Sequence, residues 1–169
     1  MNADTNFDLE EEWSQADQYL TYKVGKEAYG IRILSVREIR GWEPVARIPN
    51  APGYVKGVLN LRGTAVPVID MRMRLNISDP LYNITTVLIV VRSEINGTER
   101  IAGIVVDSVS DVMNARSNDI LGTPDFGDNV DTAFISGLVD VDGKMVMIFD
   151  VDSFMKHPDI YDSPVDEEQ

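Results

Sequence analysis

The sequence predicts a mainly β protein in which two small β-barrels of about five strands each pack together, with short helices beside them. Three observations point to this fold class. Short segments of alternating apolar and polar residues recur at regular spacing between turn residues, which favours barrels over a sandwich. One pattern of residues occurs twice along the chain. The chain has 169 residues, of which 44% are hydrophobic, so it can bury a sizeable core.

The C-terminal parts of the two repeats align without a gap. The segment from Tyr54 to Asp70 matches the segment from Phe134 to Asp150, and the aromatic residue, both glycines and the final aspartate coincide. Further upstream, Gly30-Ile31, Val36 and Glu38-Ile39 match Gly103-Ile104, Val109 and Asp111-Val112 at a constant offset. A unit of this size cannot close a large core alone. We therefore expect a first barrel at roughly 30–80 and a second at roughly 85–156, with the N-terminal strand as a candidate to cross between them.

In the first half, residues 18–24 alternate as a strand, 25–27 form a turn and 28–34 return. Residues 35–41 are either a short twist or a third strand, because seven residues do not show a clear period. Pro52 predicts a short helix at 53–56. The stretch 57–70 reads as two strands joined by a tight turn at Arg62-Gly63, where glycine supplies a positive φ. Pro67, in the returning strand, predicts a sheet edge or a bulge.

The second half repeats this order. Asp70 can cap a short helix at 71–75, and 76–83 connects the two repeats. Strands are expected at 85–91 and 100–107 around the hairpin signal Asn96-Gly97, followed by the segment 108–115. A polar loop at 117–130 precedes the second hairpin, whose tip is Asp142-Gly143. Asp150 can cap a helix at 151–156.

Arg62 lies at the tip of a stiff hairpin, which is how a recognition residue is often presented. The simpler interpretation is a soluble turn residue, since most surface charges contribute little. The other repeat, however, has Asp142 at the equivalent tip. If arginine merely suited the turn, either half could use it, so the asymmetry favours a functional role.

The net charge of −13 is concentrated at the two ends of the chain. Eleven acidic residues lie in 1–17 and 157–169, which contain no Lys or Arg, so residues 18–156 carry a net charge of only −2. We expect acidic, flexible tails at 1–16 and 157–169 around a folded domain at 17–156. The sequence has no basic patch, so we expect no binding to nucleic acid. It also has no signal peptide and no long apolar run, so we expect no membrane insertion, and the absence of cysteine suits the cytoplasm.

The sequence shows no reaction centre, cofactor motif or metal site. Without cysteine there is no thiol nucleophile or thiolate ligand, and the single histidine, His157, borders an acidic tail. No phosphate-binding glycine loop or dinucleotide fingerprint is present. The aspartates at 140, 142, 150 and 152 lack the spacing of a calcium loop, and we interpret them as turn and cap residues. A binding module is therefore favoured over an enzyme.

Several motifs, in matching order and spacing, resemble the CheW family of bacterial chemotaxis coupling proteins. They are Tyr29-Gly-Ile31, Val36-Arg-Glu-Ile39, the run from Pro52 to Gly63, Pro67-Val-Ile-Asp70, Gly103-Ile-Val-Val-Asp107 and Val109-Ser-Asp-Val112. The resemblance covers roughly residues 17–156, without the tails and the long hairpin 93–99. It implies two SH3-like barrels and no catalysis, metal or cofactor. It also implies a cytoplasmic adaptor, recruited to receptor arrays, that joins methyl-accepting chemoreceptor tips to the regulatory domain of the histidine kinase CheA.

The resemblance also implies where partners bind. The receptor-tip helix would occupy a groove between the barrels, and barrel-end strands would meet the kinase. Candidate receptor- or kinase-binding residues are Val36, Glu38, Ile39, Gly57, Arg62, Gly103 and Val112. Aliphatic side chains would give apolar contact, and charged ones would fix register. We hypothesise that Glu38 and Arg62 pair with each other or flank one contact. Val36 and Val112 are equally well explained as core residues.

Two alternatives stay open from the sequence. One is an enzyme whose site the sequence does not reveal. The other is a coupling protein of a non-flagellar chemosensory pathway, for example one for twitching motility, or the coupling half of a CheV-like protein. The few residues after the second barrel leave no room in this sequence for a CheV receiver domain.

Overall fold

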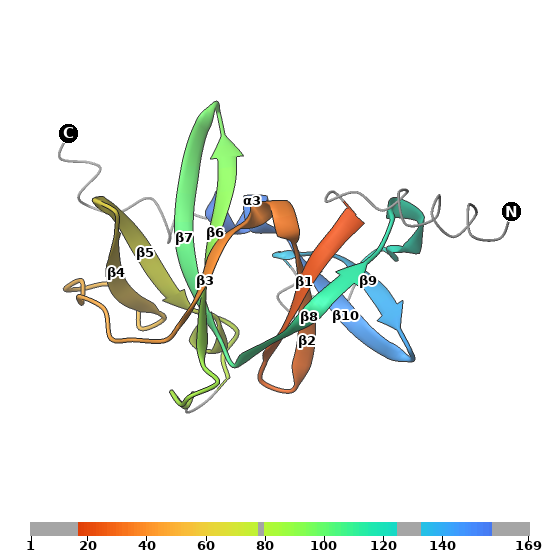
Figure 1. The fold of residues 1–169 in the computed structure, drawn as a ribbon, viewed down its shortest axis with the longest axis horizontal. Helices are drawn as coiled ribbons and strands as arrows, with labels where there is room; N and C mark the ends of the chain where they lie inside the picture. The colour runs from red at the N-terminus through yellow and green to blue at the C-terminus, as the bar shows by residue number, and fades with distance from the viewer. Residues whose placement is uncertain (1–16, 78–79, 125–132, 157–169) are drawn as a thin grey trace, which may run out of the picture.

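The computed structural model describes residues 17–77, 80–124 and 133–156, and its strands form two five-stranded sheets. Figure 1 shows the sheets side by side, each curled into a small barrel. The strands are β1 (Gln18–Val24), β2 (Glu27–Arg32), β3 (Val36–Gly41), β4 (Val55–Leu61), β5 (Thr64–Asp70), β6 (Val87–Ile95), β7 (Thr98–Val106), β8 (Ser108–Asn114), β9 (Ile135–Val141) and β10 (Lys144–Phe149). This confirms the predicted pair of SH3-like barrels.

The two barrels exchange hairpins between the repeats. One sheet has the order β3-β6-β7-β5-β4 and the other the order β8-β1-β2-β10-β9. The two orders correspond strand for strand, but each sheet combines three strands of one repeat with the first hairpin of the other. We call the sheet of β3 to β7 the first barrel and the other sheet the second barrel.

The observed barrels therefore divide the chain differently from the expected 30–80 and 85–156. Strands β6 and β7, after residue 85, belong to the first barrel, whereas β1 and β2 belong to the second. The reason is a parallel pairing in each barrel, of β5 with β7 and of β10 with β2, which joins strands far apart in sequence. Apolar periodicity shows which face of a strand is buried, but not which strand lies beside it.

One isolated β-bridge in each barrel helps its sheet to curl. Ala46, after β3, bridges to Val58 in β4, and Leu121, after β8, bridges to Leu138 in β9. Each bridge brings the two edge strands of its sheet towards one another. The bridges occupy matching places in the two repeats, so both barrels curl in the same way.

The short helices confirm the predicted caps. Helix α2 (Met71–Arg74) begins after Asp70, whose side chain accepts a hydrogen bond from the backbone N–H of Arg72. Helix α3 (Val151–Met155) begins after Asp150, which accepts from the backbone N–H of Ser153. The 3₁₀ turns η2 (Ile33–Ser35) and η3 (Ser117–Asp119) complete the helical segments of the described residues.

Three other local expectations are resolved or corrected. Residues 36–41 form a strand, which settles the open alternative for 35–41. The helix expected at 53–56 is wrong, because a turn at 53–54 leads directly into β4. Pro67 is neither at an edge nor in a bulge: β5 is an inner strand, and its ladder with β7 covers only 68–70, so the missing N–H costs no bond there. The tails, His157 and residues 125–132 of the polar loop lie outside the described residues.

Three hairpins use the same tight turn. The tip residues Arg62-Gly63, Asn96-Gly97 and Asp142-Gly143 all have positive φ, between 49° and 86°. This is the type I′ geometry, whose twist matches that of the flanking strands. In two of the hairpins a side chain supports the tip: Asn60 and Asp140 each accept a hydrogen bond from the glycine N–H, at 2.9 Å. The turns at Arg62 and Asp142 are therefore equivalent in backbone and differ in charge.

The largest apolar core belongs to both barrels. It combines Leu20, Tyr22 and Ile31 of the second barrel with Ile89, Val91 and Ile104 of the first. Phe154 of α3 and Met71 of α2 complete it. Helix α3 follows β10 of the second barrel but packs against β6 of the first, where Asp152 accepts a hydrogen bond from the hydroxyl of Ser93. The barrels thus share this core between them, and each barrel also has a smaller core of its own.

Candidate docking seam between the barrels

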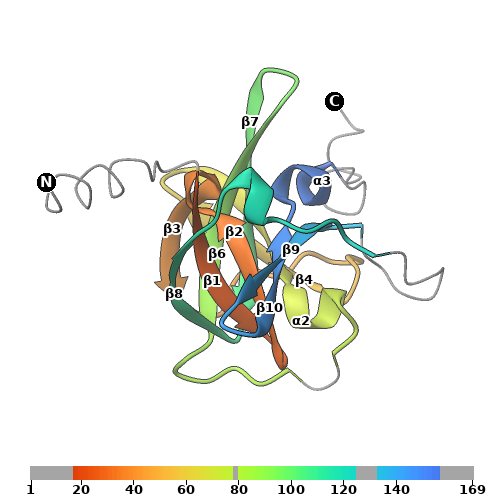
Figure 2. The ribbon, with the colours of Figure 1, turned by 90° about the vertical axis from the view of Figure 1, so that its right-hand side faces the viewer.

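The strands β3 and β8 present one edge of each barrel on the same face of the molecule. They are the outermost strands in their sheets, next to β6 and β1 respectively. Figures 1 and 2 together place both strands at the front of the first view, with η2 above the space between them. We call the strip of surface between these two sheet edges the seam.

A bulge turns two aliphatic residues of β3 towards the shared core. Val36 pairs with Val91, and Ile39 pairs with Ile89. Val36 and Ile39 are three positions apart in β3, whereas their partners in β6 are only two positions apart. The extra residue is Arg37, which lies in the register shift. Residues directly opposite in an antiparallel pair point to the same face. Val36 and Ile39 therefore share the face of the core residues Val91 and Ile89.

The same device recurs in β8. Val112 pairs with Leu20 and Val109 with Tyr22, and the register shift between them again leaves an extra residue in the edge strand. The side chain of Thr21 supports this bulge: its hydroxyl bonds the carbonyl oxygen of Asp111 at 2.9 Å and the N–H of Asp111 at 3.0 Å. The seam thus has an aliphatic pair on each side, Val36 with Ile39 and Val109 with Val112.

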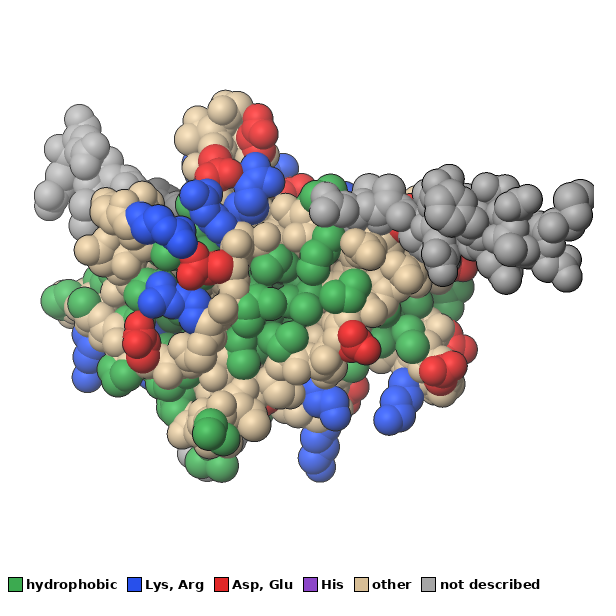
Figure 3. Space-filling view, in the orientation of Figure 1, with side chains coloured by type: hydrophobic (Ala, Val, Ile, Leu, Met, Phe, Trp, Pro, Cys, Tyr) green, Lys and Arg blue, Asp and Glu red, His purple; other side chains and the backbone are tan. Residues whose placement is uncertain are grey.

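The seam residues combine burial with exposure. Val36 and Val109 are half-buried and pack against the shared core. Ile39 and Val112 are 47% and 44% exposed, which is high for large aliphatic side chains. Figure 3 shows hydrophobic side chains gathered at the middle of this face, with charged side chains beside them. An exposed apolar strip with a charged border is typical of a protein-docking surface.

Ion pairs line the first-barrel side of the seam. Nη1 of Arg62 lies 3.3 Å from Oε1 of Glu38, which confirms the hypothesised pairing. The other carboxylate oxygen of Glu38, Oε2, lies 3.8 Å from Nη1 of Arg40. The Arg62 side chain is 74% exposed, so the pair adds about 1 kcal/mol or less to stability. Its exposed guanidinium is available for a partner at little cost to the fold.

A second ion-pair group continues this border. Glu99 in β7 accepts from Arg37 and from Arg92, both at 2.7 Å. The hydrogen bond from Arg92, together with the charges of both arginines, lowers the pKa of Glu99 below its usual value. The hairpin of β6 and β7, which projects from the body in Figure 2, is thereby joined to β3 beside the seam.

Two of the predicted site residues, Gly57 and Gly103, are buried. Gly57 lies in a β4 bulge at φ 149°, where an added Cβ would overlap the carbonyl oxygen of Ala46. Gly103 lies in the inner strand β7, where a Cβ would be 2.8 Å from Leu88. Their place in a binding site stays a prediction, and the structure shows a packing role for each: Gly57 admits the Ala46 backbone and Gly103 the Leu88 side chain.

The sequence reasoning missed Val109 and Leu34 as seam residues. Val109 was recognisable, because the repeat makes it the counterpart of Val36. Leu34 is 49% exposed in η2, and its carbonyl oxygen accepts from Arg92 at 3.4 Å. No signal in the sequence distinguishes Leu34, since its exposure follows from the crossing of the chain between the barrels.

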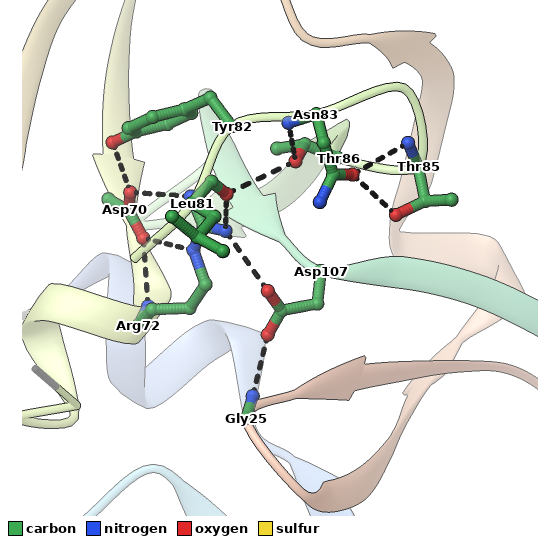
Figure 4. Close-up of polar contacts among 9 residues, drawn as sticks. All are labelled: Gly25, Asp70, Arg72, Leu81, Tyr82, Asn83, Thr85, Thr86 and Asp107. Carbon is green, nitrogen blue, oxygen red and sulfur yellow. Dashed lines mark hydrogen bonds and ion pairs between the residues drawn. The ribbon is translucent and has the colours of Figure 1, made fainter. Parts of the chain in front are cut away.

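The sequence reasoning also missed a buried polar network between the barrels. Arg72 and Asp70 are 1% and 0% exposed, and Asp70 accepts from both Nε and Nη2 of Arg72 at 3.0 Å. Nη1 of Arg72 bonds the carboxylate of Asp107 at 3.0 Å and the carbonyl oxygen of Leu81. The Tyr82 hydroxyl donates to Asp70, as Figure 4 shows. Each buried charge is thus paired, which such burial requires.

The network shifts the titration of its members. Burial alone would raise the pKa of Asp70, but hydrogen bonds from Arg72 and Tyr82 and the charge of Arg72 hold it below its usual 3.8. Burial, followed by the hydrogen bond to Asp70, raises the pKa of Tyr82 to about 12. Burial would lower the pKa of Arg72, but its two carboxylate partners raise it, so it stays charged.

The described residues contain neither a metal-ligand cluster nor a long apolar helix. Within the three described ranges, no three His, Asp or Glu side chains converge to hold a metal ion. Asp140 and Asp150 support a turn and a cap, as predicted, whereas Asp152 instead bonds Ser93. The longest helix in the described part of the chain has five residues, so none there can span a membrane.

Comparisons with known proteins agree with this architecture. The sequence profile of the CheW-like domain matches residues 18–159. Chemotaxis protein CheW of Klebsiella aerogenes is 39% identical over 138 residues, which is 82% of this chain and 81% of that protein. CheW of Rhizobium meliloti is 35% identical over 136 residues, or 80% and 85% of the two chains. The crystal structure of the scaffolding protein TtCheW from Thermoanaerobacter tengcongensis superposes with a TM-score of 0.69 at 32% identity, covering 79% and 88%.

The close approach at Gly57 predicts a large effect of a single methyl group. We expect Gly57→Ala to lower the free energy of unfolding by about 3 kcal/mol or more, from backbone strain and overlap with Ala46. Urea unfolding measures this. Gly41→Ala is the matched control, because a Cβ at Gly41 meets nothing within 4 Å, and we expect a change of about 0.5 kcal/mol or less. Equal effects of the two substitutions would contradict the structural role of Gly57.

The buried network predicts a pH-dependent contribution of Tyr82. Because the folded-state pKa of Asp70 is lowered, its carboxylate stabilises the fold above about pH 4, and this is lost as the pH falls through the folded-state pKa. Tyr82→Phe keeps the ring beside Trp42 but removes the donor to Asp70. We expect it to cost about 1–2 kcal/mol near pH 7, and less near pH 3, in urea unfolding. An equal cost at both pH values would show that the hydroxyl does not act on the ionised carboxylate.

Proposed function

Because this chain belongs to the CheW-like domain family, we propose that it is a non-catalytic adaptor that couples methyl-accepting chemoreceptors to the histidine kinase CheA. In this proposal it works in the cytoplasm at membrane-bound receptor arrays. The cytoplasmic tip of the receptor and the regulatory domain of CheA are its two partners. The observation that carries the proposal is the seam: two aliphatic pairs, one from each barrel, bordered by the Glu38–Arg62 ion pair.

The seam suits a helix as its occupant. An amphipathic helix places apolar residues about one turn apart on one face, and a strip of aliphatic side chains can receive them. Val36, Val109 and the shared core beneath give a firm base. Ile39 and Val112 stand higher on the two sides, since almost half of each is exposed. Removing this exposed area from water supplies affinity, at about 25 cal/mol per Å² before the costs of association.

The ion pair gives such a contact direction. Glu38 and Arg62 lie on the first-barrel side, whereas their counterparts in the repeat, Asp111 and Asp142, are both acidic. A helix reversed in the seam would meet different charges at each position. Charges at the border of an interface contribute mainly to orientation, partner choice and association rate. Arg62 is therefore proposed to select the register of the bound helix.

The central experiment combines this chain with CheA and a receptor-tip fragment. We expect a ternary complex by size-exclusion chromatography and a kinase activity above that of CheA alone. Binding to neither component would overturn the proposal. Binding to both without any change in kinase output would leave an assembly role and remove the coupling role.

Arg62→Ala tests the charged border. We expect it to weaken binding of the receptor-tip fragment about three- to tenfold in calorimetry, with a nearly unchanged melting temperature. Asp142→Ala is a matched control, because it places alanine in the same left-handed turn position, at φ 51° instead of 49°, of the other barrel. A large loss of stability with Arg62→Ala alone would mark Arg62 as structural.

Lysine substitutions test the apolar part of the seam. We expect Ile39→Lys and Val112→Lys each to lower affinity for the receptor-tip fragment more than tenfold, because a charge would be desolvated in the contact. Both side chains are partly exposed, so folding should survive. Ile84→Lys, at a side chain that is 99% exposed in the 80–86 loop, is the control for added charge. Equal effects of all three would point to charge alone.

A further inference from the structure

Two short crossings of the chain connect the barrels, and one of them is the single residue Asp107. Strand β7 of the first barrel ends at Val106, and β8 of the second begins at Ser108. The backbone N–H of Asp107 donates to the carbonyl oxygen of Lys23, in β1, at 2.9 Å. The chain is thus bonded to the second barrel at the residue where it leaves the first.

The side chain of Asp107 also contacts both barrels. Oδ1 accepts from Nη1 of Arg72 at 3.0 Å, and Oδ2 accepts from the N–H of Gly25 at 2.6 Å. Arg72 lies in α2, two residues after the end of β5 in the first barrel, whereas Gly25 lies in the turn between β1 and β2 of the second. Figure 4 shows the carboxylate between these two groups. One side chain therefore spans the boundary.

Arg72 offers Asp107 a fixed partner. Its guanidinium is 1% exposed and is held by two hydrogen bonds to Asp70 and one to the carbonyl oxygen of Leu81. A planar guanidinium donates in set directions, so its remaining bond to Asp107 is directional too. If the barrels rotated relative to each other, Arg72 could not follow Asp107 without breaking its other bonds.

The other crossing lacks such a clamp. The offset of the repeat places Leu34 at the position equivalent to Asp107, in the turn η2 between β2 and β3. An aliphatic side chain that is 49% exposed can make no comparable ionic bridge. Of the two crossings, the one at Asp107 therefore carries the ionic bridge, which adds a directional constraint to the apolar packing between the barrels.

We propose that the Asp107 carboxylate is a positioning group that fixes the relative orientation of the two barrels and thereby the spacing across the seam. Val109 follows Asp107 by two residues, so a rotation at this crossing displaces the β8 side of the seam directly. Val36 and Ile39, on the β3 side, stay with the first barrel. The consequence for receptor binding rests on the proposed function, whereas the effect on barrel orientation does not.

The test removes the bond between Arg72 and Asp107 and keeps the bond from Gly25 to residue 107. In Asp107→Asn the amide oxygen can still accept from Gly25, but the amide nitrogen cannot accept from Arg72. We measure backbone residual dipolar couplings of the whole chain. We expect one alignment tensor to fit both barrels of the unsubstituted protein. In D107N each barrel should still fit its own tensor, and the joint fit should fail. Asp142→Asn, at an exposed hairpin tip, should keep the joint fit.

The same variants are titrated with the receptor-tip fragment. We expect D107N to bind about fivefold or more weakly than the unsubstituted chain. A D107N protein with the original joint alignment overturns the proposal. A changed alignment with unchanged affinity overturns its extension to the seam. If the unsubstituted chain does not bind the fragment, the proposed function fails, and the couplings still decide the role of Asp107.

A second variant covers the case in which D107N does not fold. Arg72→Lys keeps a cation beside Asp70 but loses the planar fork that also reaches Asp107. We expect R72K to show the same separation of the two alignment tensors. Loss of cooperative folding in both variants would assign the clamp to folding alone and overturn the positioning role.

Discussion

The exchange of hairpins between the two repeats is the constraint on which the rest of the structure depends. Each barrel completes its sheet with two strands from the other repeat, and the parallel pairs β5–β7 and β10–β2 seal that exchange. The largest core therefore belongs to both barrels. Two barrels that exchange hairpins and bury a common core between them pack as one body, so the surface between them is a permanent feature rather than a passing contact.

This constraint also explains why the docking seam is symmetric in its apolar part and asymmetric in charge. The edge strands β3 and β8 hold equivalent places, and equivalent bulges turn Val36, Ile39, Val109 and Val112 towards the shared core. On the first-barrel side, the carboxylate of Glu38 pairs with Arg62 beside this strip. Shape alone would accept a helix in two directions, and unequal charges at the two sides can distinguish them.

The residues of the candidate site came from the resemblance to the CheW family. One hypothesis about them is confirmed, because Nη1 of Arg62 lies 3.3 Å from Oε1 of Glu38. The packing roles of Gly57 and Gly103 were not predictable, since a sequence motif does not separate a glycine that contacts a partner from one that admits a neighbouring segment. Arg72 and Asp107 gave no signal, because their burial depends on loops and turns that meet only in the folded chain.

The sequence by itself determined the mainly β class, the duplication, the tight hairpin turns and the two aspartate caps, since each follows from local periodicity or from residues a few positions apart. Only the tertiary structure decided which hairpin joins which barrel, the bulges that aim the seam residues, and the clamp at Asp107. These features are set by pairings across many tens of residues. Alternation along a strand fixes the face that is buried, but the neighbour that buries it is chosen by the packing of the whole chain.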